Sequence, residues 1–393
     1  MAAVLAAGGA EPVRGRLVEV TVPAAGVRVF GGPGGVYLVE NETISKYALP
    51  SARLDWRVSM SGHVVMAAGM PLVTSDGLGS RTVALDPGTG GVRWRRAGAP
   101  AFASHGGVQL LTDRRSGVDT VRYEVVDVAS GATRWELTEQ DGDDVFFDGD
   151  RFVRWSPSGQ VEVRDMGTGR VLSTGVVPPP AGDGLPFRDV WGRRLVGDLL
   201  LVAREVGGVR VSDAYDLDRL VPRWSADIDL AVQEVSDCGS DVCVGQATGK
   251  LVIDADTGRI RSTGTRVIDA DTGRVRWSTD RPGLLESVGS VMISYDITEQ
   301  PPEIRILDAA DGRLRADLGR WHIGWPHGDG DGDALAIRGG TDGTVWIAEL
   351  DLARGRVQTL GIVRDAVDCE TSWRLVVCRR PDGTTGIWYS RPR

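Results

Sequence analysis

The segment Ala84-Leu85-Asp86-Pro87-Gly88-Thr89-Gly90-Gly91-Val92-Arg93-Trp94 carries a pattern that recurs along the chain. A short apolar run ends in Asp, Gly follows four residues later, and Trp follows four residues after the Gly. Two further copies, at 125–135 and 267–277, keep all three residues. Weaker copies keep only part of the pattern, as Asp165/Gly169, Asp254/Gly258, Asp308/Gly312, Asp351/Gly355, Asp216/Trp224 and Ala48/Trp56.

The spacing of these copies predicts the fold. The Asp, or the residue in its place, stands at positions 48, 86, 127, 165, 216, 254, 308 and 351, so five of the seven intervals measure 38 to 43 residues. That length is typical of one four-stranded blade of an all-β propeller. The two longer intervals contain a Pro- and Gly-rich inter-blade insert at 177–187 and a local tandem duplication at 252–279. We expect the duplication to be looped out or fitted as an extra strand pair, without adding a blade.

Each residue of the pattern has a structural role. Asp opens a tight turn in which its carboxylate accepts backbone N–H groups, and Gly supplies the positive φ that closes the turn. Trp lies on the next strand, where we expect it to wedge between neighbouring blades and to donate its indole N–H to a backbone carbonyl. The complete copies are therefore predicted to be architectural: Asp86, Gly90, Trp94, Asp127, Gly131, Trp135, Asp269, Gly273 and Trp277.

The two ends of the chain predict how the ring closes. A lone strand at Leu17–Val22 precedes the first blade, and three strands, Val367–Trp373, Leu375–Arg379 and Gly386–Tyr389, follow the last pattern. Pairing of the lone strand with these three closes the ring and removes exposed sheet edges. We predict a single propeller over residues 16–391 with eight blades, seven or nine being the alternatives.

Composition and charge narrow the classes of function. The chain has 393 residues and a net charge of -9, which argues against nucleic-acid binding because phosphate is repelled. No apolar stretch reaches the roughly 20 residues of a transmembrane segment. Residues 1–15 are expected to be a frayed N-terminus or the remnant of an export signal or anchor. The abundant Ala, Gly, Val and Arg are typical of a high-GC genome and indicate a bacterial protein.

The four cysteines form two local pairs, Cys238/Cys243 and Cys369/Cys378, each around the turn between the first two strands of a blade. Cross-strand neighbours in a hairpin have Cα atoms roughly 4.5–5.5 Å apart, which suits a disulfide. We predict two hairpin disulfides and an oxidising, extracytoplasmic compartment. Free thiols and a metal site are the alternatives, although neither pair has the usual spacing of zinc ligands.

The run at 84–94 resembles the repeat of the PQQ-like (quinoprotein-like) β-propeller family, whose blades are WD40-like, over roughly residues 16–391. This family includes quinone-dependent dehydrogenases and non-catalytic propellers such as the outer-membrane assembly lipoprotein. For a dehydrogenase the resemblance implies an adjacent Cys-Cys disulfide over PQQ and a calcium ion held by Asp, Glu and Asn. The chain has no adjacent Cys pair and a single Asn, Asn41. The resemblance therefore implies the non-catalytic type, without PQQ or calcium.

Two groups of residues are candidates for ligand sites. Asp329, Asp331 and Asp333 alternate with Gly, as at the start of a calcium loop, but the Gly and Glu that such a loop requires further on are missing. A weak metal site there is the alternative to an acidic turn. Trp191, Trp321 and Trp325 lie near loop-rich stretches and are candidates for lining a ligand pocket.

The function expected from the sequence is that of a binding scaffold. No nucleophile elbow and no phosphate-binding loop occurs, and no residue is assigned a catalytic role. We expect a monomeric, extracytoplasmic propeller that binds a protein or a cell-envelope component. A PQQ-dependent dehydrogenase and a carbohydrate-binding propeller are the alternatives.

Overall fold

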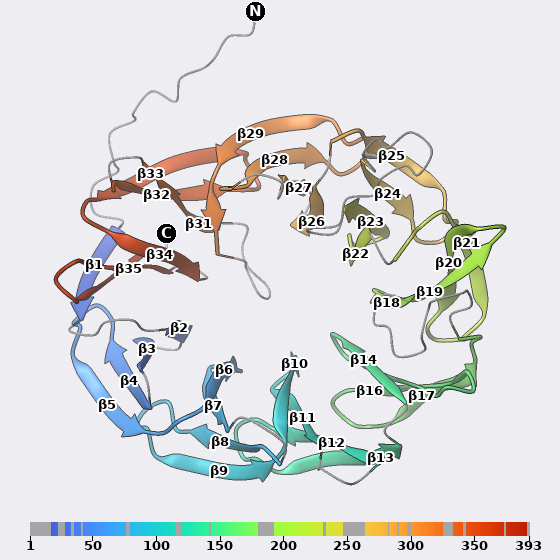
Figure 1. Cartoon of the computed structure of the whole chain (residues 1–393), viewed down its shortest axis with the longest axis horizontal. Helices are drawn as coiled ribbons and strands as arrows, with labels where there is room; N and C mark the ends of the chain where they lie inside the picture. The colour runs from blue at the N-terminus through green and yellow to red at the C-terminus, as the bar shows by residue number, and fades with distance from the viewer. Residues whose placement is uncertain are drawn as a thin grey trace, which may run out of the picture. The chain divides into compact units, whose positions relative to one another are not determined.

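The computed structural model describes most of the chain as β-sheet. The described residues are 17–22, 28–32, 35–40, 42–75, 79–114, 119–140, 143–179, 192–230, 233–246, 264–281, 283–288, 291–296, 300–324, 333–340, 343–372 and 375–390. Within them the strands form nine four-stranded sheets, which we call blades and name by their strands (Figure 1). These ranges contain no α-helix, and hence none that has the length and apolar character to cross a membrane.

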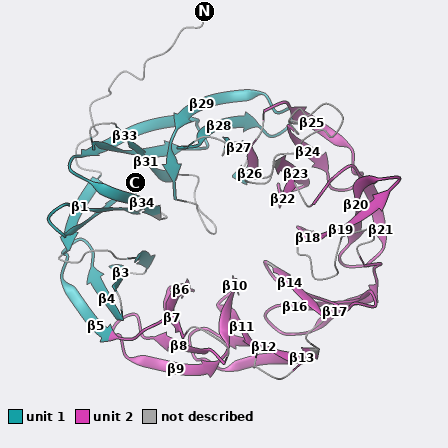
Figure 2. Cartoon of the chain, viewed as in Figure 1, with its two compact units in different colours: residues 1–58, 286–393 teal, residues 59–285 magenta. Residues whose placement is uncertain are grey.

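The chain divides into two compact units, residues 1–58 with 286–393 and residues 59–285 (Figure 2). Four blades lie almost wholly in the first unit. They are β1 (Leu17–Val22) with β34 (Val367–Ser372), β35 (Leu375–Arg379) and β36 (Thr385–Ser390); β2 (Arg28–Gly32), β3 (Gly35–Glu40), β4 (Thr43–Ala48) and β5 (Leu54–Ser59); β26 (Leu284–Val288), β27 (Val291–Asp296), β28 (Glu303–Asp308) and β29 (Leu314–Arg320); and β30 (His322–Ile323), β31 (Asp333–Gly339), β32 (Val345–Asp351) and β33 (Arg356–Val363).

Five blades lie in the second unit. They are β6 (His63–Ala67), β7 (Met70–Thr74), β8 (Arg81–Leu85) and β9 (Val92–Ala97); β10 (Ala99–His105), β11 (Val108–Arg114), β12 (Thr120–Asp127) and β13 (Thr133–Gln140); β14 (Asp144–Asp148), β15 (Arg151–Trp155), β16 (Gln160–Asp165) and β17 (Val171–Val176); β18 (Arg193–Val196), β19 (Leu199–Val206), β20 (Val209–Asp216) and β21 (Pro222–Ala226); and β22 (Gln233–Asp237), β23 (Asp241–Gln246), β24 (Thr265–Asp269) and β25 (Val275–Thr279).

The N-terminal strand completes the sheet of the last three strands, as predicted. β1 pairs with β36 in antiparallel register from Leu17↔Ser390 to Val22↔Thr385. The predicted number of eight blades was wrong, because the described strands form nine. Eight blades contain one copy of the repeat turn each, and the sheet of β1 with β34–β36 is additional. Chain length misleads here because blades differ in size: β18 has 4 residues and β30 has 2.

The repeat turn forms as its residues predict. In the β6–β9 blade the Asp86 carboxylate accepts hydrogen bonds from the backbone N–H groups of Gly88 and Thr89, both at 2.9 Å. Gly90 then takes a φ of 72°, which favours glycine. The same left-handed residue closes the equivalent turns at Gly131, Gly169, Gly273, Gly312 and Gly355.

In three blades the repeat Trp contacts the following blade. Trp94 of β9 donates its indole N–H to the carbonyl oxygen of Val128, at 2.8 Å, in the turn of the β10–β13 blade. A Cβ atom on Gly131 of that turn would lie 2.4 Å from Cγ of Trp94, so the indole occupies the space that glycine leaves. Trp135 and Trp224 repeat this arrangement with Met166 and Gly169, and with Ala270 and Gly273.

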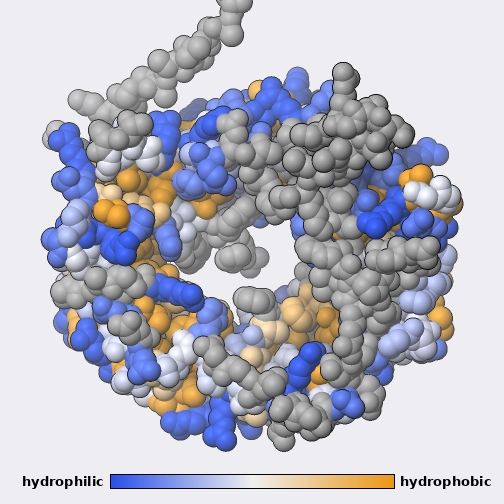
Figure 3. All heavy atoms as spheres, in the orientation of Figure 1, coloured by the Kyte–Doolittle hydropathy of each residue, from blue (hydrophilic) through white to orange (hydrophobic). Residues whose placement is uncertain are grey.

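The apolar core lies between neighbouring blades as well as within them. Leu72 of β7, Trp94 of β9 and Leu111 of β11 belong to one cluster of buried residues. On the face of the molecule that Figure 3 displays, apolar and hydrophilic residues are intermixed. The β6–β9 and β10–β13 sheets therefore bury apolar side chains against each other, as neighbouring units of repeat architectures do.

The insert and the duplication lie only partly within the described residues. Val177, at the start of the insert, is buried in the core between the β14–β17 and β18–β21 blades, whereas 180–187 lie outside the described residues. The second copy of the duplication forms part of β24 and the turn after it. The first copy, 252–259, lies outside the described residues, so the expectation of a loop or an extra strand pair stays a prediction.

Candidate functional site

The repeat also includes an arginine directly before the Trp, which was not recognised from the sequence as part of the pattern. Arg93, the residue before Trp94, donates from Nε to the second carboxylate oxygen of Asp86 at 2.8 Å. The same pair forms in four further blades, as Arg134–Asp127, Arg223–Asp216, Arg276–Asp269 and Arg315–Asp308. The signal was present, because Arg directly precedes Trp in four of the patterned segments.

These contacts engage the turn carboxylates fully. Hydrogen bonds from the Ser130 hydroxyl, from Arg134 and from the Ser130 backbone lower the pKa of Asp127 to about 2. Thr272 and Arg276 lower the pKa of Asp269 to about 2 in the same way. A carboxylate held ionised by such partners is a poor general base near neutral pH. These contacts favour a structural role for Asp127 and Asp269.

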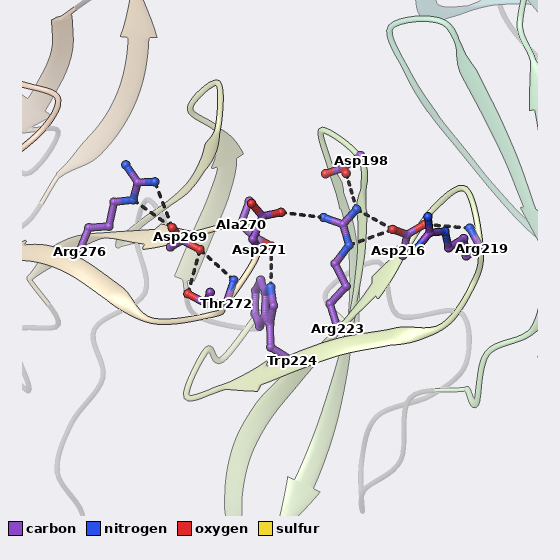
Figure 4. Close-up of polar contacts among 10 residues, drawn as sticks. All are labelled: Asp198, Asp216, Arg219, Arg223, Trp224, Asp269, Ala270, Asp271, Thr272 and Arg276. Carbon is purple, nitrogen blue, oxygen red and sulfur yellow. Dashed lines mark hydrogen bonds and ion pairs between the residues drawn. The ribbon is translucent and has the colours of Figure 1, made fainter.

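Among the repeat arginines, Arg223 contacts three carboxylates within the described residues (Figure 4). Its guanidinium lies 2.6 Å from carboxylate oxygens of both Asp198 and Asp216, and 3.6 Å from one of Asp271 in the next blade. The adjacent Trp224 donates its indole N–H to the carbonyl oxygen of Ala270 at 2.7 Å. Two consecutive residues thus join the β18–β21 and β22–β25 blades, one by charge and one by packing.

The residues predicted to line a pocket or to bind a metal are placed only in part. Trp191, Trp325, Asp329 and Asp331 lie outside the described residues, and only the backbone of Asp333 is described, at the start of β31. In the described part of the chain, no group of three or more His, Cys, Asp or Glu side chains is arranged to hold a metal ion. The metal site and the pocket stay predictions.

Trp321 packs as a core residue instead of facing solvent. Its side chain is buried at 3% exposure, and its indole N–H donates to the carbonyl oxygen of Leu318 at 2.7 Å. The Arg338 guanidinium lies 4.7 Å from the centre of one indole ring. Both the hydrogen-bonding group and the ring are thus engaged within the protein, which disfavours a role in stacking against a ligand.

The two cysteine pairs form disulfides, as predicted. Cys238 bonds Cys243 across the β22–β23 hairpin, and Cys369 bonds Cys378 across β34–β35. No cysteine remains free. The adjacent Cys-Cys disulfide that a PQQ site of the resembling dehydrogenases implies cannot form in this chain. The residues present do not fit that cofactor.

A hairpin of the β18–β21 blade extends past the strands beside it. β19 and β20 pair along eight residues each, from Leu199↔Asp216 to Val206↔Val209. The flanking strands are shorter: β18 reaches only to Val202 of β19, and β21 only to Ser212 of β20. In the β10–β13 blade, by contrast, β13 pairs along β12 up to its first residue. We call residues 203–212 the extended hairpin.

The tip of the extended hairpin is apolar and is closed by a two-glycine turn. Gly207 and Gly208 have φ values of 60° and 80°, the two positive values of a type I′ turn. Behind the tip, Arg204 makes two hydrogen bonds to Asp213 across the strands, at 2.7 and 2.9 Å. Val206 and Val209, which face each other across the turn, are 49% and 55% exposed. Two valines are therefore exposed to solvent at the end of a two-stranded ribbon.

No protein-family model and no curated protein matches the chain. Among solved structures, the chain is similar to BamB from Moraxella catarrhalis, at 12% identity and a TM-score of 0.41. It is also similar to the computationally designed Ika8 protein, at 15% identity and a TM-score of 0.41. Each likeness covers 95% of this chain and 99% of the other chain.

Proposed function

We propose that this protein is a non-catalytic scaffold that binds a protein partner of the cell envelope outside the cytoplasm, with the tip of the extended hairpin as part of its binding surface. The observation that carries the proposal is the exposure of Val206 and Val209 on a ribbon that outreaches both flanking strands. Single exposed valines are common on protein surfaces, but an apolar pair at a projecting tip is suited to enter an apolar recess of a partner.

The strand pairing within the hairpin supports a role in binding. Ordering a flexible loop on association costs free energy, and a loop that is already ordered avoids that cost. The β19–β20 pairing and the Arg204–Asp213 contact order the hairpin before a partner arrives. Because the two valine side chains are already about half buried, burial of the remainder contributes about 3 kcal/mol at most, which is enough for a specific contact within a larger interface.

The compartment is supported by the cysteine chemistry. Both pairs are oxidised, and structural disulfides persist in oxidising compartments and are rare in the cytosol. A component of the cell envelope is therefore the kind of partner that the protein would encounter.

A binding experiment with matched variants tests the proposal. The double substitution Val206→Asp and Val209→Asp places charge at the tip, and Val171→Asp with Val275→Asp does the same at valines that are 42% and 50% exposed in other blades. Each purified protein is immobilised, exposed to envelope extract of the source organism and washed, and the retained proteins are quantified by mass spectrometry. We expect a defined partner to be retained by the wild-type protein and by the Val171/Val275 variant, and to be lost from the hairpin variant. Equal retention by both variants, or no specific retention by the wild type, would refute the role of the hairpin.

A further inference from the structure

Two buried carboxylates share one guanidinium where the β10–β13 blade meets the β14–β17 blade. Arg154 of β15 lies 2.7 Å from Glu139, near the end of β13, and 2.7 Å from Asp143, directly before β14. The side chains of Glu139 and Asp143 are only 9% and 7% exposed, whereas that of Arg154 is 31% exposed. One positive charge thus faces two acidic groups that solvent barely reaches.

The alternation along β13 shows that Glu139 faces the next blade. Glu139 lies on the same face of the strand as Trp135, whose indole binds the Met166 carbonyl of that blade. Arg122 and Glu136, which bond each other at 2.5 Å, lie on the opposite face. The side chain of Glu139 therefore points to the β14–β17 blade and makes its ionic contacts there.

Further charged groups lie around Glu139. Asp143 comes from the connection before β14, Arg154 from β15 and Glu162 from β16, and Glu162 in turn bonds Arg164 at 2.6 Å. On the side of its own blade, Val121 stands opposite Glu139 in the register, and Arg114 lies two strands away on the same face. Asp144, the residue after Asp143, forms its ion pair with the buried Arg193. Glu162 thus has Arg164 as its own partner, whereas Glu139 and Asp143 share Arg154.

The sharing of one guanidinium by two buried carboxylates favours a proton on one of them. Burial raises the pKa of Glu139 to about 7, against the attraction of Arg154. A hydrogen bond to Asp143 and the negative charges of Asp143 and Glu162 raise it further. A protonated Glu139 can donate its O–H to Asp143, and Arg154 then neutralises Asp143 alone.

We propose that Glu139, Asp143 and Arg154 form a proton-sensitive joint between the β10–β13 and β14–β17 blades. The joint is closed when Glu139 carries a proton and loosens when Glu139 is ionised. The stability of this joint decreases as the pH rises, whereas the contribution of the turn carboxylates increases. The reason is that the closed joint binds the proton of Glu139 more tightly than the unfolded chain does. The joint uses residues separate from the extended hairpin, so it stands or falls independently of the proposed function.

Linkage defines the pH range in which the joint responds. A single proton site increases the equilibrium constant for opening by at most about tenfold per pH unit between its pKa in the open state and that in the closed state. For Glu139 this range runs from its ordinary pKa of 4.5 to its raised pKa of about 7. Above pH 7 the opening equilibrium no longer changes with pH. Protection of the joint therefore falls from about pH 5 to 7 and then stays level.

Hydrogen–deuterium exchange of the full-length protein between pH 5 and 8.5, corrected for intrinsic exchange rates, tests the joint. In the wild type we expect the protection of peptides from β13 and β14 to decrease up to about tenfold per pH unit until pH 7. Glu139→Gln keeps a neutral donor at this position and should remove the decrease. Glu136→Gln, which changes an exposed carboxylate with its own arginine on the other face of β13, should retain it.

Asp143→Asn provides a second, independent variant. It leaves Arg154 to pair with Glu139 alone, so we expect protection that no longer depends on pH in this range. A wild-type protein without the decrease, or a Glu139→Gln variant that still shows it, would overturn the proposal. The same holds if Asp143→Asn leaves the decrease unchanged.

Discussion

Trp94 and Gly131 fit together across the boundary between two blades: the indole ring stands where a side chain on residue 131 would be, with 2.4 Å between the Trp94 Cγ and the place of a Cβ. Gly131 also has a φ of 70°, so two separate reasons require glycine there. The same relationship joins Trp135 to Gly169 and Trp224 to Gly273.

Substitution of Gly131 is expected to loosen this boundary. Gly131→Ala must displace the Trp94 ring and also strain the backbone, and we expect it to lower the free energy of unfolding by about 3 kcal/mol. Gly106→Ala is the control, because Gly106 has a φ of 55° and open space where its Cβ would be. Backbone strain alone should cost the control about 1 kcal/mol. Urea denaturation of both variants measures the difference; equal losses would show that the indole contact is unimportant.

Removal of Arg223 is expected to cost more than removal of an arginine with a single acidic partner. Arg223→Ala leaves Asp216, whose side chain is 11% exposed, without the guanidinium, and we expect a loss of about 2 kcal/mol. Arg93→Ala removes the same repeat position where the pair is more exposed, and should cost about 0.5 kcal/mol. Chemical denaturation at neutral pH measures the loss of stability in both variants. A larger loss for Arg93→Ala than for Arg223→Ala would contradict the idea that the three carboxylates make Arg223 the more important residue.

The turn carboxylates predict acid sensitivity. The pKa of Asp127 is lowered in the folded state, so its contribution to stability is present above about 3.8 and is lost as the pH falls towards 2. Asp127→Asn should reduce stability at pH 6 and weaken its dependence on pH between 4 and 2. Asp119→Asn, an exposed carboxylate outside the turns, should leave that dependence unchanged. Thermal unfolding of the three proteins from pH 2 to 6 decides whether the wild type and the Asp127 variant converge at low pH.

Both disulfides are expected to stabilise the fold, and to different extents. Cys369→Ser with Cys378→Ser opens a loop of nine residues and leaves a hydroxyl at the fully buried position 378. We expect a loss of about 3 kcal/mol, against about 2 kcal/mol for the pair Cys238→Ser with Cys243→Ser, whose loop has five residues. Denaturation with and without dithiothreitol measures both, and non-reducing peptide mapping checks the pairing. A reducing agent without effect on the wild-type protein would contradict this prediction.

The local parts of the structure could be read from the sequence because each depends on residues close together in the chain. The turn from Asp86 to Gly90 and the disulfide between Cys238 and Cys243 need only a short segment in one conformation. The wedge of Trp94 also followed, because the spacing shows which residue must lie between consecutive blades. Arg93 carried an equally regular signal, but an exposed arginine has no obvious partner until the turn geometry is known.

The sequence by itself determined an all-β chain of repeated four-stranded blades, because the turn-and-tryptophan unit prescribes its own strands and its own contact with the next copy. Only the tertiary structure decided that there are nine blades in the described residues, and that the β19–β20 hairpin outreaches β18 and β21. Only the tertiary structure shows that Glu139 and Asp143 share the guanidinium of Arg154. The physical reason is that the lengths of the strands and the contacts between charged side chains depend on how neighbouring sheets pack. No short segment of the chain encodes that packing.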